Sequence, residues 1–586
     1  MRLRPILPIL LALAASGVHA ASWSLSDART AISFNRSLLR DLGVQVRDIE
    51  RGDLRFAPHE HALGYDARLV FGARNDKRLA VDMQGHVLEH LLGPGLHHRG
   101  GFELAWKGGA LSLQQFVLAP AFAPRSFELR TRDGEVAFTA DFAHFEVDRD
   151  AGKLQLFNLD LRIAPALAQR LQQPQLAGVA IGTLELEARV QAPEAEAKLG
   201  TPPGCSNWSG DKDVALTAIG SVGQWERQGG FVAVSPSATL RNVGSGNVPW
   251  YGKFTGPFPP YNNDQHPFLV WAIFRSANGV FEQIGTSDVK HAFLTINSGC
   301  DAGACTDSHI LGLGCSDVYG EGTNNSTGSL SFRPEVTAGL GLWNHTGSHF
   351  DQNGDGVQDH SGSDPFPIHR ATVQETDLQT PGAEYFLEAW YVVRDDVNIF
   401  NSMGWRRMTP SLPGGIWIFT LNTALANGSV LDAWVNPTSP PAGSRNELLT
   451  LPEGHVRLAV KTTDLGGGQT RYEYALANHD FDRQIGSFFV PTGGNSVGNL
   501  YFHDVDRNAG SDWIATQDAN GITWTKPAAS AGLDWGTLYN FGFTAATPPT
   551  NASATLAAVE VGAPAQLTLQ TLAPTDIGLV FADGFE

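Results

Sequence analysis

The stretch VAFTADFAHFEVDRDAGKLQLFNLDLRIA, residues 136–164, alternates apolar and polar side chains on both sides of a short polar turn. Alternation with a period of two places the apolar side chains of a strand on one face. The turn runs from Asp148 to Gly152, and aspartate with glycine at such a point is typical of a β-hairpin. The stretch therefore predicts two antiparallel strands, and a fold built from strands of this kind.

Similar alternation recurs along the chain, for example in IGTLELEARVQ (181–191) and in RLAVKTTDLGGGQTRYEYALANHD (457–480). The composition agrees with this pattern, because 64 glycines, 33 prolines and 32 phenylalanines accompany only 17% charged residues. We expect a mainly β protein made of tandem antiparallel β-sandwich-like modules with few short helices. One such helix is predicted in APALAQRLQQPQLAG (164–178), where a proline stops it.

The chain opens with a basic start, an apolar run and the small residues of a cleavage site, which predicts a secretory signal peptide. The protein is therefore expected to be secreted, and no later segment has the length of a membrane span. The expected organisation is a signal peptide (1–20), an N-terminal β-rich module (22–195), a linker (196–204), a central module (205–405), a C-terminal β-sandwich (410–562), and a spacer with an acidic tail (563–586).

The net charge of −19, from 41 basic and 60 acidic residues, bears on the class of partner. So acidic a surface argues against nucleic acid or an anionic membrane as a partner. An extracellular glycan or a component of the cell envelope is compatible with it.

Four cysteines, an even number in an exported protein, predict disulfides. Three connectivities are possible, and we favour Cys300–Cys305 across CDAGAC with Cys205–Cys315 closing a long loop. The alternative is a thiolate metal site made of Cys300, Cys305 and Cys315 with His309.

The run DQNGDGVQD (351–359) places oxygen donors at alternate positions, with Gly356 where the backbone must turn. Ca²⁺ takes six to eight oxygen ligands, and this spacing suits it. The expected ligands are Asp351, Asn353, Asp355, the carbonyl of Val357, Asp359 and Asp364. An EF-hand has a glutamate at position 12 of its loop; this chain has Gly362 there, and Asp364 is expected to take the place of that glutamate. The run resembles the calcium loops of dockerins and thrombospondin type-3 repeats, which implies a structural calcium ion.

A second resemblance covers roughly residues 260–545. The strings GCSD (314–317) and WGTLYNF (535–541), with the segments between them, are similar to a set of uncharacterised secreted bacterial β-rich proteins. That resemblance implies no activity and transfers no catalytic residue.

Histidines gather in two parts of the chain, 59–144 and 266–369, seven in each. Imidazoles grouped in this way could bind copper or zinc, so a transition metal is a possible second cofactor; scattered surface or hydrogen-bonding histidines are the alternative. In the second group His266, His291 and His309 are the best candidates, because each adjoins an apolar strand.

Carboxylates provide a further candidate site. Asp317 lies beside a probable cystine, Glu335 follows Arg333, and Glu388 lies in an aromatic strand. Polysaccharide-degrading enzymes use such carboxylates with aromatic platforms, whereas structural ion pairs are the alternative. The Gly-x-Ser-x-Gly, HExxH and Walker motifs are absent from the sequence, which disfavours serine hydrolases, zincins and NTPases.

Two functions are compatible with these patterns. The first is a secreted calcium-binding protein, surface-associated or binding a glycan or envelope component. The second is a metal-dependent extracellular enzyme, an oxidoreductase or a polysaccharide-degrading enzyme, whose catalytic candidates are His266, His291, His309, Asp317 and Glu335. The sequence does not decide whether the protein is an enzyme, nor its oligomeric state.

Overall fold

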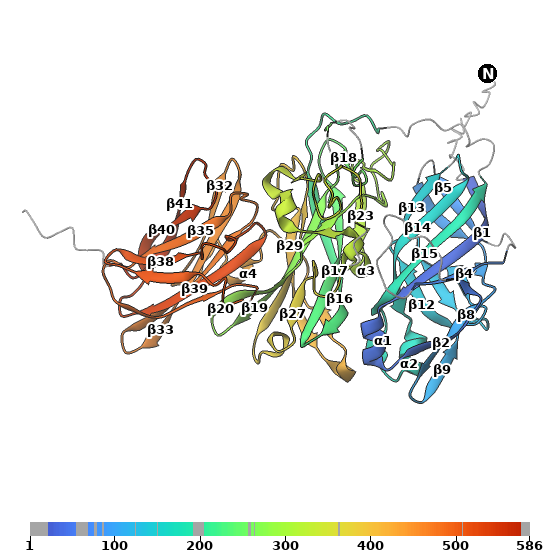
Figure 1. The fold of residues 1–586 in the computed structure, drawn as a ribbon, viewed down its shortest axis with the longest axis horizontal. Helices are drawn as coiled ribbons and strands as arrows, with labels where there is room; N and C mark the ends of the chain where they lie inside the picture. Colours follow the sequence, from blue (N-terminus) through green and yellow to red (C-terminus); the bar gives the residue numbers. More distant parts are fainter. Residues whose placement is uncertain are drawn as a thin grey trace, which may run out of the picture.

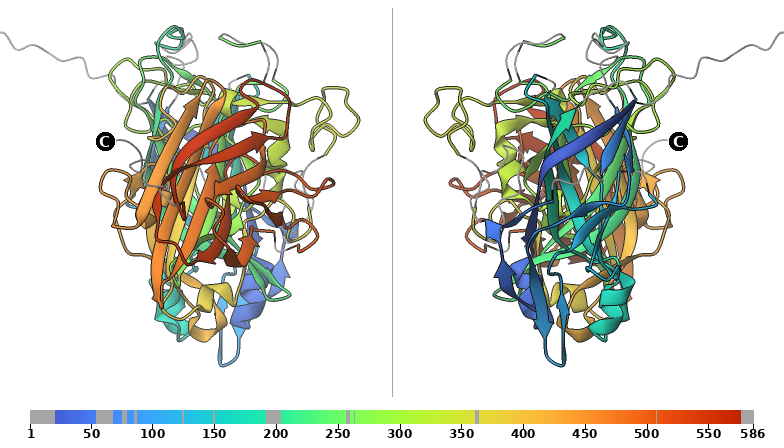
Figure 2. Two further views of the ribbon diagram at one scale, coloured as in Figure 1. Left: turned by 90° about the vertical axis from the view of Figure 1, so that its left-hand side faces the viewer. Right: turned by 90° about the vertical axis from the view of Figure 1, so that its right-hand side faces the viewer.

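Three β modules follow one another along the longest axis of the computed structural model (Figure 1). Views along that axis show them one behind another (Figure 2). The structure describes residues 21–53, 68–74, 79–84, 87–123, 125–148, 150–191, 204–255, 260–262, 264–360, 364–506 and 508–575. The expected signal peptide, nearly all of the linker and the acidic end of the tail lie outside these residues. The mainly β fold is confirmed, and every pairing between named strands is antiparallel in the described residues.

The first module holds a 12-stranded sheet whose main path runs β3-β4-β1-β15-β14-β12-β11-β10-β7, and a 3-stranded sheet of order β2-β8-β9. Its strands are β1 (Ala21–Phe34), β2 (Gln45–Glu50), β3 (Gly52–Asp53), β4 (Arg68–Gly72), β5 (Ala80–Gln84), β6 (Val87–Leu92), β7 (Leu96–His97), β8 (Gly101–Trp106), β9 (Gly109–Ser112), β10 (Val117–Pro120), β11 (Phe127–Arg130), β12 (Val136–Asp141), β13 (His144–Asp148), β14 (Lys153–Ile163) and β15 (Ala180–Gln191); its helices are α1 (Arg36–Leu42) and α2 (Pro165–Arg170).

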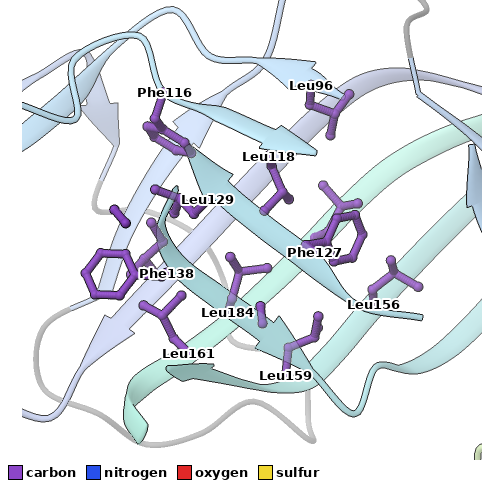
Figure 3. Packing of buried hydrophobic residues seen from close by; sticks show 14 of the residues in the cluster. Leu96, Phe116, Leu118, Phe127, Leu129, Phe138, Leu156, Leu159, Leu161 and Leu184 are labelled. Atoms are coloured by element: carbon purple, nitrogen blue, oxygen red, sulfur yellow. The ribbon is translucent and has the colours of Figure 1, made fainter. Parts of the chain in front are cut away.

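The stretch 136–164 forms three strands where the sequence predicts two. The predicted hairpin is confirmed, because β13 pairs with β14 from Asp148 opposite Lys153 onward. The other half of β14 pairs with β12, and the chain changes direction at Phe142, whose φ is +65°. The apolar side chains of these strands enter one core with those of β10, β11 and β15, as Leu129, Phe138 and Leu184 illustrate (Figure 3). The predicted helix is present as α2.

The central module packs an 8-stranded sheet, whose main path is β24-β21-β19-β28-β29-β30, against a 4-stranded sheet of β16, β17, β23 and β27. Its elements are β16 (Val214–Gln228), β17 (Phe231–Asn242), β18 (Val248–Pro249), β19 (Phe268–Ala277), β20 (Val280–Thr286), β21 (Val289–His291), β22 (Ile310–Leu311), β23 (Ser316–Tyr319), α3 (Glu321–Asn324), β24 (Leu330–Ser331), β25 (Val336–Thr337), β26 (Leu342–Trp343), β27 (Thr372–Gln374), β28 (Glu384–Val392), β29 (Met403–Ser411), β30 (Ile418–Leu421), β31 (Ala426–Asn427) and α4 (Leu431–Trp434).

The third module is a β-sandwich of two 5-stranded sheets, ordered β32-β33-β34-β39-β36 and β37-β38-β35-β40-β41. Its strands are β32 (Ser444–Leu451), β33 (Gly454–Gly466), β34 (Gln469–Asn478), β35 (Ile485–Pro491), β36 (Val497–His503), β37 (Ile514–Gln517), β38 (Gly521–Thr525), β39 (Thr537–Ala545), β40 (Thr550–Ala558) and β41 (Gln566–Ala573).

The boundaries of the sandwich differ from the expected 410–562. Strand β29 pairs with β28 on one side and β30 on the other, so the central module continues past residue 405. At the other end β41 pairs with β40 along its length and buries Leu567 and Leu569, so part of the expected spacer is an edge strand of the sandwich.

The disulfides join Cys205 to Cys305 and Cys300 to Cys315, so the favoured pairs Cys300–Cys305 and Cys205–Cys315 are wrong. The thiolate metal site is excluded as well, because all four sulfurs are in disulfides. The bonds close loops with sequence separations of 100 and 15. Disulfides of this kind persist in oxidising compartments, which fits export.

A long-range strand contact decides this pairing. Ser298 and Ser316 form an antiparallel bridge, which brings Cys300 close to Cys315, with their Cα atoms 3.9 Å apart. Sequence spacing favours pairing of Cys300 with the nearest cysteine. The β-bridge between Ser298 and Ser316 forms only in the folded chain, so spacing does not predict it.

The first and central modules meet at a buried cluster of charges. Arg162 on β14 donates from Nη2 to Asp160 Oδ2 at 2.8 Å and from Nη1 to Glu321 Oε1 at 3.0 Å, and its Nε lies 3.1 Å from Asp141 Oδ2. Glu321 begins α3 of the central module, which Figure 1 shows at the boundary between the two modules. Asp160 is fully buried and Glu321 is 1% exposed. Removing one member of such a cluster leaves an unpaired buried charge, so the cluster fixes how the modules meet.

Asp160 also accepts two backbone N–H groups of α3, from Glu321 at 2.8 Å and from Gly322 at 2.9 Å. The approach is so close that a Cβ on Gly320 would lie 2.4 Å from Asp160 Oδ2. A glycine at position 320 is therefore required by the contact between modules.

The central module and the sandwich are joined by a reciprocal pair. Arg333 Nη1 donates to the carbonyl of Trp535 at 3.0 Å, and Trp535 Nε1 donates to the carbonyl of Arg333 at 3.2 Å. Asn540 Nδ2 adds a hydrogen bond to the carbonyl of Phe281 at 2.6 Å. The expected ion pair of Arg333 with Glu335 is not among these contacts.

The charge cluster predicts a dependence of stability on pH. Burial raises the pKa of Asp160 to about 8; Arg162 opposes the shift, and the carboxylates of Glu321 and Asp141 add to it. Because an unfolded aspartate titrates near pH ~4, the folded protein holds a proton between about pH 4 and pH 8 that the unfolded chain has released. The free energy of unfolding contributed by Asp160 therefore falls as pH rises through this window.

The variant Asp141→Asn removes one carboxylate of the cluster and is expected to make this fall smaller. The measurement is the thermal unfolding midpoint of both proteins across the window. Other groups also titrate between about pH 4 and pH 8, so the test compares the pH dependence of the unfolding midpoint in the two proteins. Identical pH profiles would contradict the prediction.

Candidate functional site

Two buried histidines lie side by side in the central module. His266 Nε2 and His291 Nδ1 are 2.8 Å apart, and the rings of Phe268, Trp343 and, for His291, Phe350 pack around them. His291 is fully buried at the end of β21, and burial, with His266 as the next cause, lowers its pKa well below the ordinary value. His291 is therefore neutral.

A chain of hydrogen bonds connects this pair to Glu335. His291 Nε2 lies 2.8 Å from the Ser331 hydroxyl, and that hydroxyl is hydrogen-bonded to Glu335. Because Ser331 donates to the carboxylate, it accepts from His291 Nε2–H, which leaves Nδ1 to accept from His266. Three of the five catalytic candidates thus belong to one network.

Glu335 connects the network to the predicted calcium loop. Its Oε1 accepts the backbone N–H of His349 at 2.7 Å, and its Oε2 accepts Trp343 Nε1 at 3.4 Å. Burial raises the pKa of Glu335, although these hydrogen bonds and that of Ser331 act against the shift.

The predicted calcium loop is a tight turn organised by its own side chains. Asp351 is fully buried, and its carboxylate accepts the N–H groups of Gly347, Asp355 and Gly356 at 3.0 to 3.1 Å. Burial alone would raise the pKa of Asp351, but these N–H groups lower it. The Asp355 N–H is also 2.9 Å from Asn353 Oδ1, so the Asp351 and Asn353 oxygens share one donor.

The other carboxylates of the predicted set accept different N–H groups. Asp355 Oδ1 accepts the N–H of Val357 at 2.9 Å, and Asp359 accepts the N–H groups of Gln352 and Asn353 at 3.0 and 3.1 Å. Asp364 lies with histidines instead, because its Oδ2 is 3.0 Å from His349 Nε2.

The histidines that flank the loop form a cluster with Asp364. His349 precedes the loop and His360 follows it; His360 Nε2 is 3.5 Å from the same Asp364 Oδ2. In the described part of the chain, these three residues are the one group of three or more His, Cys, Asp or Glu side chains with ligand atoms all within 4.8 Å of one another. His369 packs on the ring of His349, with centroids 4.6 Å apart, and pairs through Nδ1 with Asp288 at 2.8 Å.

The other two catalytic candidates lie at the contact with the first module. Asp317 is fully buried; its Oδ1 accepts the N–H of Ile296 at 2.8 Å and is 3.3 Å from His144 Nε2 of β13. His309 Nε2 is 3.4 Å from Glu146 Oε1 of the same strand. These two candidates therefore face partners that lie more than 150 positions earlier in the sequence.

In the N-terminal histidine group, His98 has a structural role. It is fully buried, its Nε2 is 2.8 Å from the hydroxyl of Thr30, and its ring stacks on Phe116. Burial lowers its pKa to about 3. His59 and His61, of the same histidine group, lie outside the described residues.

A groove between the first two modules passes the histidine cluster. It has a volume of about 650 Å³, and Asp364 contributes to its wall. Its other lining residues are Phe34, Asn35, Arg36, Ser37 and Arg40 from the first module and Trp225, Glu226, Gln228, Asn325, Pro365, Phe366 and Arg370 from the central module. Pockets of roughly 300–1,000 Å³ hold small ligands, so the groove has a suitable size.

Comparison with known proteins adds little. No family model matches the chain, and no curated protein matches it. The C-terminal domain of HtaA from Corynebacterium glutamicum, a solved structure, is similar with a TM-score of 0.19 and 12% identity, over 29% of this chain and 99% of that chain. Likeness at this level carries no argument about function. No helix in the described residues is long and apolar enough to cross a membrane.

The network around Glu335 gives a testable prediction. Glu335→Ala leaves the His349 N–H and Trp343 Nε1 without their acceptor, and an unsatisfied buried donor costs roughly 1–3 kcal/mol. Hydrogen exchange at the His349 amide is expected to accelerate, and the unfolding midpoint to fall. The matched control is Glu384→Ala, whose exposed pair with Arg407 is worth about 0–1 kcal/mol. Equal effects of the two variants would show that Glu335 does not hold the loop.

Proposed function

We propose that the protein is a secreted binding protein that holds an acidic glycan in the groove between its first and central modules. The observation that carries the proposal is the composition of the groove wall. Three arginines, Arg36, Arg40 and Arg370, line it against two acidic residues, Glu226 and Asp364, so the wall has an excess of basic residues in a chain whose overall charge is negative. Arginine forms paired hydrogen bonds with carboxylates, which suits the uronate groups of acidic polysaccharides.

The remaining wall also supports a sugar ligand. Phe366, which packs against the buried Trp225, supplies apolar surface, and Gln228 and Asn325 supply planar amides of the kind that hydrogen-bond to hydroxyl groups. Because the two sides come from modules joined by the buried Arg162 cluster, the groove is formed before a ligand arrives. Preformed walls reduce the ordering cost of binding.

Calcium belongs to this proposal as a structural ion of the loop 351–359. Support comes from Asp351 and Asn353, whose oxygens converge on the N–H of Asp355, and from Gly356 at a φ of +79°. Asp359, like Asp351, accepts backbone N–H groups, and each of its oxygens keeps a further lone pair for a cation. Asp364 is assigned to the histidine cluster, and water is expected to replace it as a calcium ligand.

The metal-dependent enzyme remains the second candidate. The network of His266, His291 and Glu335 favours it, because buried hydrogen-bonded imidazoles can relay protons. Incubation of the protein with the glycan that it binds, followed by analysis of chain length, distinguishes the candidates. Release of shortened glycan chains would show that the protein is an enzyme and would contradict the proposal that it only binds the glycan.

Glycan binding is tested with polygalacturonate, heparin and neutral dextran as probes, by affinity electrophoresis of the mature protein. Polygalacturonate is expected to retard it and dextran is not. Arg36→Ala changes an exposed groove residue and is expected to weaken binding by roughly tenfold, since a hydrogen bond to a charged group is worth ~1.5–3 kcal/mol. The control is Arg132→Ala, an exposed arginine outside the groove. Unchanged binding in Arg36→Ala, or equal retardation by dextran, would refute the groove as the site.

The calcium proposal is tested by thermal unfolding of metal-stripped protein with and without CaCl₂. If calcium is present at ten times its dissociation constant, it stabilises the protein by about 1.4 kcal/mol. Asp355→Ala is expected to abolish the shift. Asp133→Ala, an exposed aspartate in another turn, is expected to retain it. A full shift in Asp355→Ala would place calcium elsewhere.

A further inference from the structure

We propose that His349, His360 and Asp364 form a site for a divalent transition metal, Zn²⁺ in the first instance, at the base of the loop 351–359. The site is separate from the proposed calcium ion. It also does not depend on the proposed glycan ligand, because its ligands and its test concern the metal alone.

Two of the three ligand separations are close to those around a tetrahedral ion, and all three ligand atoms lie within 4.8 Å of one another. His349 Nε2 and His360 Nε2 approach the same oxygen, Asp364 Oδ2, at 3.0 and 3.5 Å. Two ligands that are each about 2.0–2.1 Å from zinc are about 3.3–3.4 Å apart at a tetrahedral angle. The observed separations lie on either side of this value, so small movements of the side chains would admit the ion.

A neighbouring imidazole supports the assignment independently. The side chain of His369 is fully buried; its Nδ1 is held by Asp288 at 2.8 Å, and its Nε2 has no hydrogen-bond partner among the described residues. His360 Nε2 also lacks a hydrogen bond there. Buried polar atoms are normally satisfied, and carboxylate-held imidazoles are typical of metal centres. Within the site, the unpartnered nitrogen is therefore His360 Nε2, which a metal would satisfy; His369 packs on the ring of His349 and lies outside the group of three.

The donor set separates this site from the calcium loop. Two imidazoles and one carboxylate suit Zn²⁺ and related metals, whereas Ca²⁺ takes oxygen ligands. Every cysteine is in a disulfide, so thiolates do not compete for the metal within the protein. Three protein ligands leave a fourth position for water or for a group of a bound molecule, and Asp364 lines the groove.

The loop 351–359 brings the two histidine ligands together. The N–H groups of Asp359 and His360 lie 3.0 and 3.3 Å from the carbonyl of Phe350, which closes the turn and brings its two ends together. His349 and His360 stand at those ends, with ring centroids 4.5 Å apart. The short turn therefore converts an 11-residue separation in sequence into a pair of adjacent ligands.

Calorimetric titration of metal-stripped mature protein with Zn²⁺, in saturating Ca²⁺, tests the site. One Zn²⁺ per chain is expected. Since even outer-shell partners of a metal are worth roughly 10–100-fold in affinity, loss of a ligand in His360→Ala or Asp364→Asn is expected to weaken binding by about a hundredfold or more. His360 is part-exposed, so its replacement is compatible with folding, which unfolding curves will check.

His90→Ala, an exposed histidine on β6, is the matched control and should bind Zn²⁺ like the wild type. Co²⁺ provides a second readout, because a tetrahedral site gives intense visible absorption that a scattered surface histidine does not. That absorption is expected in the wild type and in His90→Ala and should be lost in His360→Ala. Absence of stoichiometric Zn²⁺ binding, or affinity unchanged in both ligand variants, would overturn the proposal.

Discussion

One guanidinium surrounded by three carboxyl groups decides how the first two modules meet. Arg162 contacts Asp160 and Asp141 of its own sheet and Glu321 of the next module, in surroundings almost closed to water. Charges are costly to bury unless each is paired, so this arrangement tolerates little displacement. The groove lies along the same contact and takes its walls from both modules. Its shape therefore depends on a cluster that is not itself part of the groove wall.

A second constraint is the compact turn at residues 351–359. Its carboxylates accept the turn's own backbone N–H groups, and Glu335 accepts the N–H of His349 immediately before it. The turn is thus tied both to the buried pair His266–His291, through Ser331, and to the groove, through Asp364. A structural calcium ion, a transition metal and a ligand in the groove would all meet within this one region of the central module. This proximity favours the central module as the functional part of the chain.

Local patterns predicted local structure well. The hairpin at Asp148, the alternating stretch that forms β33 and β34, and the helix α2 all follow from periodicity and turn residues, because neighbours in sequence decide them. The extra strand in 136–164 was missed because it depends on a positive φ at Phe142, a residue with no special preference for that conformation. The observed module boundaries differ from the expected ones because β29 pairs with β28 and β41 pairs with β40. A local sequence pattern predicts a strand but not the strand with which it pairs.

The β architecture, the candidate loop and the histidines on both sides of it can be read in the amino-acid sequence. Those properties follow from residue type and spacing alone. Tertiary structure decided the disulfide pairing, the partners of Asp317 and His309, and the meeting of His349, His360 and Asp364. The physical reason is the same in each case. Strand pairing and module docking bring together residues from distant parts of the chain, and their energies come from burial and long-range hydrogen bonds that spacing does not encode.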